Sequence, residues 1–214
     1  MEILSDEAVA TQKKFFNDHA EKWLDMWYKN SETGKYDKHE KAFARLFSLM
    51  KLKPGDTVLD AGCGTGVMAP YILERITEDG ILYEADYAEK MIEHNRKLHP
   101  QKNIRFITAD VANIALADNT CDSVICFSCF PHFRDKAQTM ATLARILKPG
   151  GLLAVSHFAS SDEINKHHEN CGAVKRDRLA GEAEMRRLFE AAGLIIDIFI
   201  DEPGFYCITS KLPE

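Results

Sequence analysis

The sequence lacks an apolar run long enough to span a bilayer, since a membrane-spanning helix needs about 20 consecutive apolar residues. Its first residues, 1–7, contain neither the basic stretch nor the apolar stretch of a secretory signal. We therefore expect a cytoplasmic protein that does not bind membranes. The six cysteines are then expected to be free thiols, because a reducing compartment disfavours disulfides.

An excess of basic residues is also absent. Lys and Arg total 27 against 33 Asp and Glu, the net charge is -6, and the basic residues are scattered along the chain. Nucleic-acid binding is driven by neutralising phosphates, so no nucleic-acid partner is expected. The short basic cluster at residues 175–178 is interpreted as a solvated face of the protein.

Internal repeats and low-complexity stretches are absent from the 214 residues. Hydrophobic residues make up 45% and charged residues 28%, the balance of an ordinary globular protein. A chain of this length buries roughly 70% of the surface that its unfolded form exposes. We therefore expect one main domain with additions, which needs no disulfide or metal in order to fold. The protein is expected to be a monomer or a homodimer.

The first part of the chain shows helical periodicity. One apolar stripe at helical spacing consists of Phe16, Ala20, Trp23, Leu24, Trp27 and Tyr28. A turn-forming stretch at residues 30–34 breaks this stripe. A second stripe consists of Phe43, Leu46, Phe47 and Met50, and a Pro-Gly-Asp turn follows it. Residues 1–53 are therefore predicted to form an N-terminal helical cap on a main domain of residues 54–214.

Beyond this cap, strands and helices alternate. The predicted strands are 57–60, 81–85, 104–108, 123–127 and 152–156, and the predicted helices are 67–76, 89–98, 136–147 and 182–192. Such alternation predicts a doubly wound α/β fold with a mostly parallel sheet. Residues 148–151 are predicted to form a sharp turn, and the polar residues 159–181 a lid or insert. Strands 194–200 and 205–210 are separated by four residues, so they must form an antiparallel hairpin.

A glycine-rich loop, Asp60-Ala61-Gly62-Cys63-Gly64-Thr65-Gly66, directly follows the first strand and precedes a helix. This placement predicts a ligand at the carboxyl ends of the strands. A dinucleotide pattern needs glycine at position 67, where this chain has Val67, and the Lys and Ser or Thr of a triphosphate-binding loop are absent. A nucleoside without phosphates remains, and the acidic Asp60 suits a cationic group on it.

Five motifs in this order resemble the class I S-adenosylmethionine-dependent methyltransferases, over roughly residues 57–158. They are Val58 to Gly66, Asp86 ahead of the helix that carries Met91, Ala109-Asp110-Val111, Cys121 to Val124, and Arg145 to Gly151. The resemblance implies S-adenosyl-L-methionine as cofactor, a seven-stranded sheet that ends in the antiparallel hairpin, and transfer of a methyl group to a small-molecule acceptor. N-terminal helices and a region like Cys129 to Asp135 also occur in quinone-type and other small-molecule methyltransferases.

The resemblance further implies roles for individual residues. Asp86 binds the ribose hydroxyls, and the side chain of Asp110 with the N–H of Val111 holds the adenine. The full cofactor set is Asp60, Gly62, Cys63, Gly64, Gly66, Asp86, Tyr87, Met91, Asp110, Val111 and Phe127. Alternatively, Asp86 is a helix N-cap and Asp110 a loop residue.

The acceptor is expected above the ends of the fourth and fifth strands. Four aromatic residues of the helical cap either line this place, which favours a flat apolar acceptor, or belong to the core: Phe15, Phe16, Trp23 and Trp27. Methyl transfer is an in-line displacement that depends mostly on proximity. His132 and His157 are candidate catalytic bases, because an imidazole titrates near cellular pH. The acceptor atom, O, C, N or S, stays open.

Cysteines and histidines also gather after these strands. The candidate metal ligands are Cys129, His157, His167 and His168, and thiolate and imidazole suit zinc or another soft metal. Alternatives are a thiol or metalloid acceptor handled by the cysteines, Cys126 as core filling, or His132 in a structural role. A noncatalytic protein that senses the cofactor is a further alternative.

Overall fold

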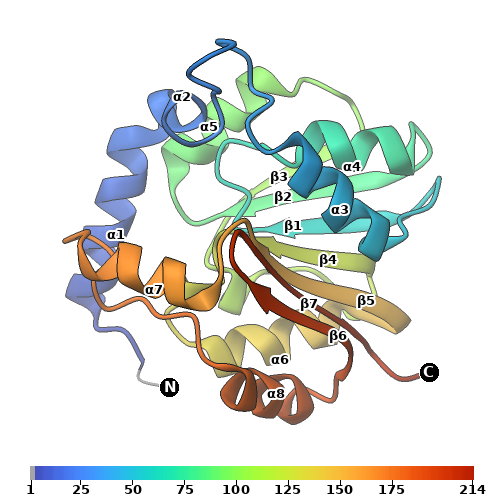
Figure 1. Cartoon of the computed structure of the whole chain (residues 1–214). Coiled ribbons are helices and arrows are strands. Elements are labelled where there is room, and N and C mark those ends of the chain that lie inside the picture. Colours follow the sequence, from blue (N-terminus) through green and yellow to red (C-terminus); the bar gives the residue numbers. More distant parts are fainter. Residues whose placement is uncertain (1–2) are drawn as a thin grey trace.

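A computed structural model describes residues 3–214, in which a seven-stranded sheet lies between layers of helices (Figure 1). Residues 1 and 2, which belong to the predicted helical cap and to the stretch in which no secretory signal is expected, lie outside the described residues. Within the described part of the chain, no helix is long and apolar enough to cross a membrane.

The sheet has the strand order β3-β2-β1-β4-β5-β7-β6. Its strands are β1 Thr57–Ala61, β2 Ile81–Asp86, β3 Ile104–Thr108, β4 Cys121–Phe127, β5 Leu147–His157, β6 Ile195–Glu202 and β7 Phe205–Lys211. The first five are parallel, and β7 lies antiparallel between β5 and β6. This confirms the doubly wound, mostly parallel sheet with a C-terminal hairpin. The strand order reverses between β1 and β4, the place where ligands bind in such sheets.

Helices cover both faces of the sheet. On one face lie α3 (Glu40–Met50), α4 (Ala69–Ile76) and α5 (Glu89–Leu98), and on the other lie α6 (Lys136–Ile146) and α8 (Glu182–Ala191) (Figure 1). The predicted stripe of α3 is its buried face. Each helix buries one apolar stripe against the sheet, which is why the strands between them are almost continuously apolar.

The N-terminal stripe belongs to more than one helix. The chain forms α1 (Asp6–His19), a single 3₁₀ turn (Ala20–Lys22) and α2 (Trp23–Trp27). Phe16 and Ala20 pack near α5, whereas Tyr28 packs with α3 and β4. The tighter 3₁₀ turn redirects the apolar stripe between these two places, which an unbroken helix would not do.

Residues 159–181, which we call the covering segment, contain α7 (Ser161–Glu169) and lie beside α1 (Figure 1). A capping box of Ser160 and Glu163 starts α7. The Asn165 side chain exchanges two hydrogen bonds with the backbone of Leu179, at 2.9 and 3.0 Å, and ties the end of the segment back to α7.

The predicted turn at residues 148–151 is part of β5, so the prediction that this strand starts at Leu152 is wrong. Leu147 already pairs with Cys121, and the next pair is Leu152 with Ser123. The extra residues form a bulge in which Gly150 takes a φ of 76°. A bulge accommodates extra residues on one strand without ending it. The other elements agree with the predicted bounds to within two residues.

The side chain of Phe189 on α8 is fully buried against the sheet. We expect Phe189→Ala to lower the free energy of unfolding by about 3–5 kcal/mol, because it leaves a cavity. Urea unfolding measures this loss. The exposed Arg187→Ala on the same helix is the control and should stay within about 0.5 kcal/mol of the wild type. A loss below about 1 kcal/mol for Phe189→Ala would contradict this account of the core.

Candidate active site

The glycine loop after β1 is fixed to the end of β2. The N–H groups of Gly62 and Cys63 donate to the Ala85 carbonyl at 2.7 and 3.0 Å. Gly62 takes a φ of 76°, and a Cβ at this position would lie 2.6 Å from the Cβ of Cys129. Glycine is therefore required here both by the backbone conformation and by the close approach of the β4 loop.

Cys129 lies beneath this loop. Ser128, with a φ of 52°, turns the chain sharply after β4, and the Cys129 thiol then donates to the Ala61 carbonyl at 2.9 Å. Burial raises the pKa of the Cys129 thiol well above its ordinary value. A buried, protonated thiol of this kind is unreactive and supports the loop.

Asn95 of α5 supports the other end of the loop. Its amide nitrogen donates to Glu84 at 2.8 Å, and a Cβ on Gly66, whose φ is 81°, would lie 2.6 Å from the Asn95 Cγ. The absence of a side chain at Gly66 thus leaves room for the Asn95 side chain under the loop. The position of Gly66 in the motif does not by itself indicate this packing role.

Three buried carboxyl groups meet at the ends of β1 and β2. Asp60 and Glu84 are paired in register on the adjacent strands, and Asp86 follows two residues later. Both oxygens of Asp60 are buried without a hydrogen-bond partner among residues 3–214. Asp86 accepts N–H bonds from Gly64 at 2.9 Å and from Ala88 at 2.8 Å, so it holds the glycine loop as well as the start of α5.

The surroundings of these carboxyl groups favour their protonated forms. Burial, followed by the charge of Glu84, raises the pKa of Asp60 well above its ordinary value. Burial raises the pKa of Glu84 to about 7 and that of Asp86 to about 6, the latter against the opposing effect of its two N–H donors. A positively charged group bound here would offset the cost of ionisation.

A cavity opens over the loop and encloses about 900 Å³, a volume that includes the solvent at its mouth. All of the predicted cofactor residues except Gly66 line it. Asp110 also caps the short 3₁₀ helix Val111–Asn113, since its Oδ1 accepts from the Ala112 N–H at 2.9 Å. Asp110, which the alternative interpretation takes as a loop residue, is therefore an N-cap that borders the cavity.

A second hollow adjoins the first and shares Phe16, Trp23, Tyr28, Phe127, Ser128 and His132 with it. The four aromatic residues predicted to roof the acceptor line this hollow, together with His157, His167 and His168. Burial, with a smaller effect of the His132 charge, lowers the pKa of His157 to about 3 and that of His168 to about 4. Both imidazoles are therefore neutral near pH 7.

The predicted metal ligands Cys129, His157, His167 and His168 do not assemble, which corrects that prediction. In the range 3–214, no group of three or more His, Cys, Asp or Glu side chains is placed to hold a metal ion. Cys129 lies under the glycine loop. The ring of His167 packs edge-on against Trp27, with the ring centroids 5.6 Å apart. His168 Nδ1 is hydrogen-bonded to the Asp177 carbonyl at 2.9 Å. Packing thus separates residues that the order of the motifs had suggested were neighbours.

Sequence reasoning missed Gln12, Glu84 and Asp177. Gln12 is buried in α1 and lines the first cavity, and its place four residues before Phe16 on the same helical stripe was a usable signal. Glu84 interrupts an apolar strand, which was also visible. Asp177, 2% exposed, lies in the polar covering segment, where nothing in the sequence distinguishes it from its neighbours.

A glycine loop at the switch point, with acidic groups after successive strands, defines a doubly wound α/β protein built to hold a nucleoside that carries positive charge. Residues 59–155 match the family model described as "Methyltransferase domain". This part of the chain is therefore a methyltransferase domain, and its motifs resemble those of the class I S-adenosylmethionine-dependent methyltransferases.

Among the relatives is a 2-phytyl-1,4-naphtoquinone methyltransferase of Nostoc punctiforme, 31% identical over 110 residues, which are 50% of this chain and 48% of that one. A probable S-adenosylmethionine-dependent methyltransferase of Mycolicibacterium smegmatis is 32% identical over 169 residues, 76% of this chain and 60% of that one. The chain thus spans about half the length of the curated relatives that it matches. The crystal structure of a SAM dependent methyltransferase from Aquifex aeolicus has a TM-score of 0.72 at 22% identity and covers 92% of this chain and 98% of that one.

The contact between Gly62 and Cys129 gives a test with a matched control. Gly193 has a φ of 77°, almost that of Gly62, but a Cβ there would meet nothing within 4 Å. We expect Gly193→Ala to cost only the left-handed strain, about 1–2 kcal/mol of unfolding free energy. Gly62→Ala adds the clash, so it should cost more and weaken S-adenosylhomocysteine binding at least about tenfold. Urea unfolding and calorimetric titration measure both effects, and equal behaviour of the two variants would contradict the proposed packing.

The raised pKa of Glu84 predicts a dependence of stability on pH. A folded-state pKa above the unfolded value of 4.5 means that the folded protein binds this proton more tightly. Its contribution to the free energy of unfolding is therefore complete below pH 4.5 and is lost as the pH rises to about 7. Glu84→Gln keeps an acceptor for Asn95 without the charge. Its free energy of unfolding should exceed that of the wild type by about 1–3 kcal/mol at pH 8 and by much less at pH 5. Urea unfolding at the two pH values measures this gain. A gain that does not depend on pH would contradict the assignment.

Proposed function

We propose that this chain transfers a methyl group from S-adenosylmethionine to a small-molecule acceptor. The observation that carries the proposal is the buried, unpartnered carboxyl group of Asp60 beside Asp86 in the cavity at the switch point. A buried carboxylate without a partner costs free energy unless a ligand supplies the missing charge. The amino group and the sulfonium of the cofactor are both cationic.

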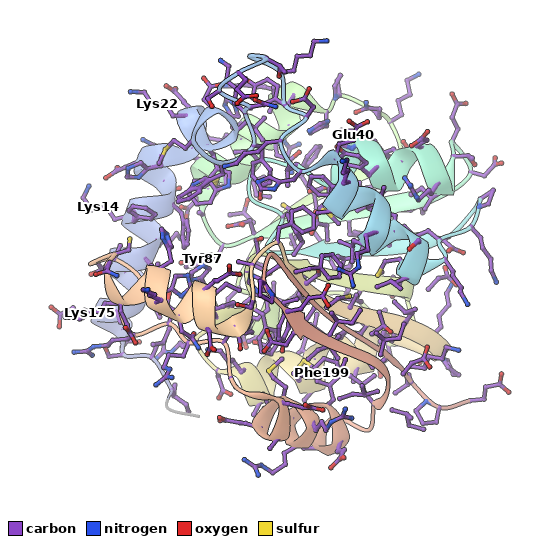
Figure 2. All side chains as sticks on the ribbon, viewed as in Figure 1. Lys14, Lys22, Glu40, Tyr87, Lys175 and Phe199 are labelled. Carbon is purple, nitrogen blue, oxygen red and sulfur yellow. The ribbon has the colours of Figure 1, made fainter. Side chains whose placement is uncertain are left out.

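The cofactor fits the residues that are present. The glycine loop leaves its main chain free for close approach, and Asp60 suits the cationic part. Asp86 retains lone pairs for the ribose hydroxyls beyond the two N–H groups that it accepts, and Asp110 and Val111 border the place of the adenine. Tyr87, Met91 and Phe127 complete the apolar walls, and Tyr87 lies next to α1 (Figure 2). When bound, the cofactor supplies an activated methyl group on sulfur.

The acceptor belongs in the second hollow under this proposal. Its lining is largely aromatic, which suits a flat apolar molecule, and the names of several relatives refer to quinones. Helices α1 and α2 of the helical cap and the covering segment act together as its roof. The contribution of the protein is to orient the acceptor and to exclude water, since proximity supplies most of the rate in an in-line displacement.

The first experiment is calorimetric titration with S-adenosylmethionine, S-adenosylhomocysteine and NAD. We expect micromolar binding of the two sulfur compounds and none of NAD. Asp86→Ala should weaken binding by about 10- to 100-fold, or about 1.4–2.8 kcal/mol, because two ribose hydroxyls lose their acceptor. The control is Asp79→Ala, which removes an exposed carboxyl group that lines neither of the two hollows.

Absence of binding, or preference for NAD, would contradict the proposal. Tight binding without methylation of any acceptor in a broad screen would favour a protein that senses the cofactor.

A further inference from the structure

His132, which is partly buried and borders both hollows, pairs with the buried Asp177. His132 Nδ1 lies 2.6 Å from Asp177 Oδ2, although the two residues belong to the loop after β4 and to the covering segment. Gln12 of α1 donates its amide Nε2 to both oxygens of the same carboxyl group, at 2.6 and 2.7 Å. Both oxygens of this carboxyl group therefore act as hydrogen-bond acceptors.

This arrangement fixes the orientation and the tautomer of the His132 ring. Because the carboxylate only accepts, Nδ1 must carry the hydrogen, and the lone pair is left on Nε2. None of residues 3–214 forms a hydrogen bond with Nε2. The His132 ring lies between the rings of Phe16 and His168, with centroid distances of 5.3 and 5.0 Å. It borders both hollows.

Asp177 is itself held in place. Its backbone carbonyl accepts from His168 Nδ1 at 2.9 Å, and its N–H donates to the Val174 carbonyl at 2.9 Å. Gln12 holds the carboxyl group from α1, and Tyr87 approaches the Gln12 amide oxygen at 3.4 Å. The network therefore joins α1, the covering segment and the cofactor cavity at one imidazole.

We propose that His132 is the general base that removes a proton from the acceptor, that Asp177 positions it, and that the acceptor is a hydroxylated aromatic ring. This inference rests on the proposed methyltransferase function. Of the histidines that line the second hollow, His157 and His168 are poor bases near pH 7, since burial lowers their pKa to about 3 and about 4. The charged and titratable groups around His132 are Asp177, His168, His157 and Asp86.

Two further observations favour a ring that carries polar groups. Trp27 Nε1 and His157 Nε2 are buried without a partner among the described residues, and both side chains line the second hollow. Buried polar atoms of this kind need a partner, which a purely apolar acceptor would not supply. A hydroxylated aromatic ring matches both the aromatic walls and these atoms.

The O–H bond of the acceptor breaks, its proton goes to His132 Nε2, and its electron pair stays on the oxygen. That pair forms the bond to the methyl carbon, at the oxygen or through conjugation at the neighbouring ring carbon, while the methyl–sulfur bond breaks and leaves its pair on sulfur. Transfer to carbon then releases the proton of that ring carbon to solvent, and the imidazolium returns its proton to the ring oxygen to restore the O–H bond. After transfer to oxygen, the imidazolium instead returns its proton to solvent.

The test compares acceptors that differ in ionisation, with S-adenosylmethionine present. 1,4-Naphthohydroquinone, kept anaerobic, needs a base, whereas the hydroxyl group of 4-nitrocatechol is already ionised by its nitro group at mildly alkaline pH. His132→Gln and Asp177→Asn should reduce kcat for the hydroquinone by about 10²–10⁴-fold and for the nitrocatechol by less than about tenfold. The controls are His94→Gln and Asp162→Asn, which remove the same groups at sites outside the two hollows and should leave both rates unchanged.

Equal losses on both acceptors would mean that the pair is only structural and would overturn the proposal. Methylation of 1,4-naphthoquinone, which has no hydroxyl group, or failure of the wild type to methylate either hydroxylated ring, would overturn the acceptor class. Nitrogen NMR of the His132 ring, with S-adenosylhomocysteine bound, should show hydrogen on Nδ1 in the wild type and a mixture of tautomers in Asp177→Asn. Hydrogen on Nε2 in the wild type would overturn the base, whereas failure of S-adenosylhomocysteine to bind would instead overturn the proposed function.

Discussion

The burial of three carboxyl groups at the ends of β1 and β2 is the constraint around which the site is organised. Burial raises the pKa of Asp60, Glu84 and Asp86, and the charge of a neighbouring carboxyl group raises the pKa of Asp60 and Glu84 further. Such a cluster lowers the stability of the unliganded protein near neutral pH, because burial must either protonate these groups or remove their charges from water. The same cluster forms a binding site for a cation. A bound cation relieves part of the free-energy cost of burying the carboxyl groups, and this relief contributes to its affinity.

The glycine loop converts this cluster into a shaped site. It is held from β2 through Ala85 and Asp86, and it rests on Cys129 from β4 and on Asn95 from α5. Close contact with Cys129 also fixes where the chain continues, and His132 follows three residues later. The position of the cofactor and the position of the proposed base are therefore set by one packing contact, and disturbing the loop should disturb both.

Much of the fold could be predicted, because its signals are local. Helical and strand periodicity, the turn residues between elements and the glycine loop depend on neighbours in the sequence, and they placed most elements to within two residues. The errors have tertiary causes. Residues 148–151 look like a turn but are held in the sheet as a bulge by pairing of Leu147 with Cys121, and the N-terminal stripe is divided between two cores.

The sequence by itself determined the order of strands and helices, the loop and the acidic residues at or just after the ends of the first three strands, since these are features of short segments. Only the tertiary structure decided which distant side chains meet. His132 and Asp177 are 45 residues apart, and Gln12 and Asp177 are 165 apart. Cys129 and His168 looked available as ligands until packing placed one under the loop and the other on a backbone carbonyl. Hydrogen bonds act over about 3 Å, so their partners are fixed by the packing of whole elements and cannot be inferred from sequence spacing.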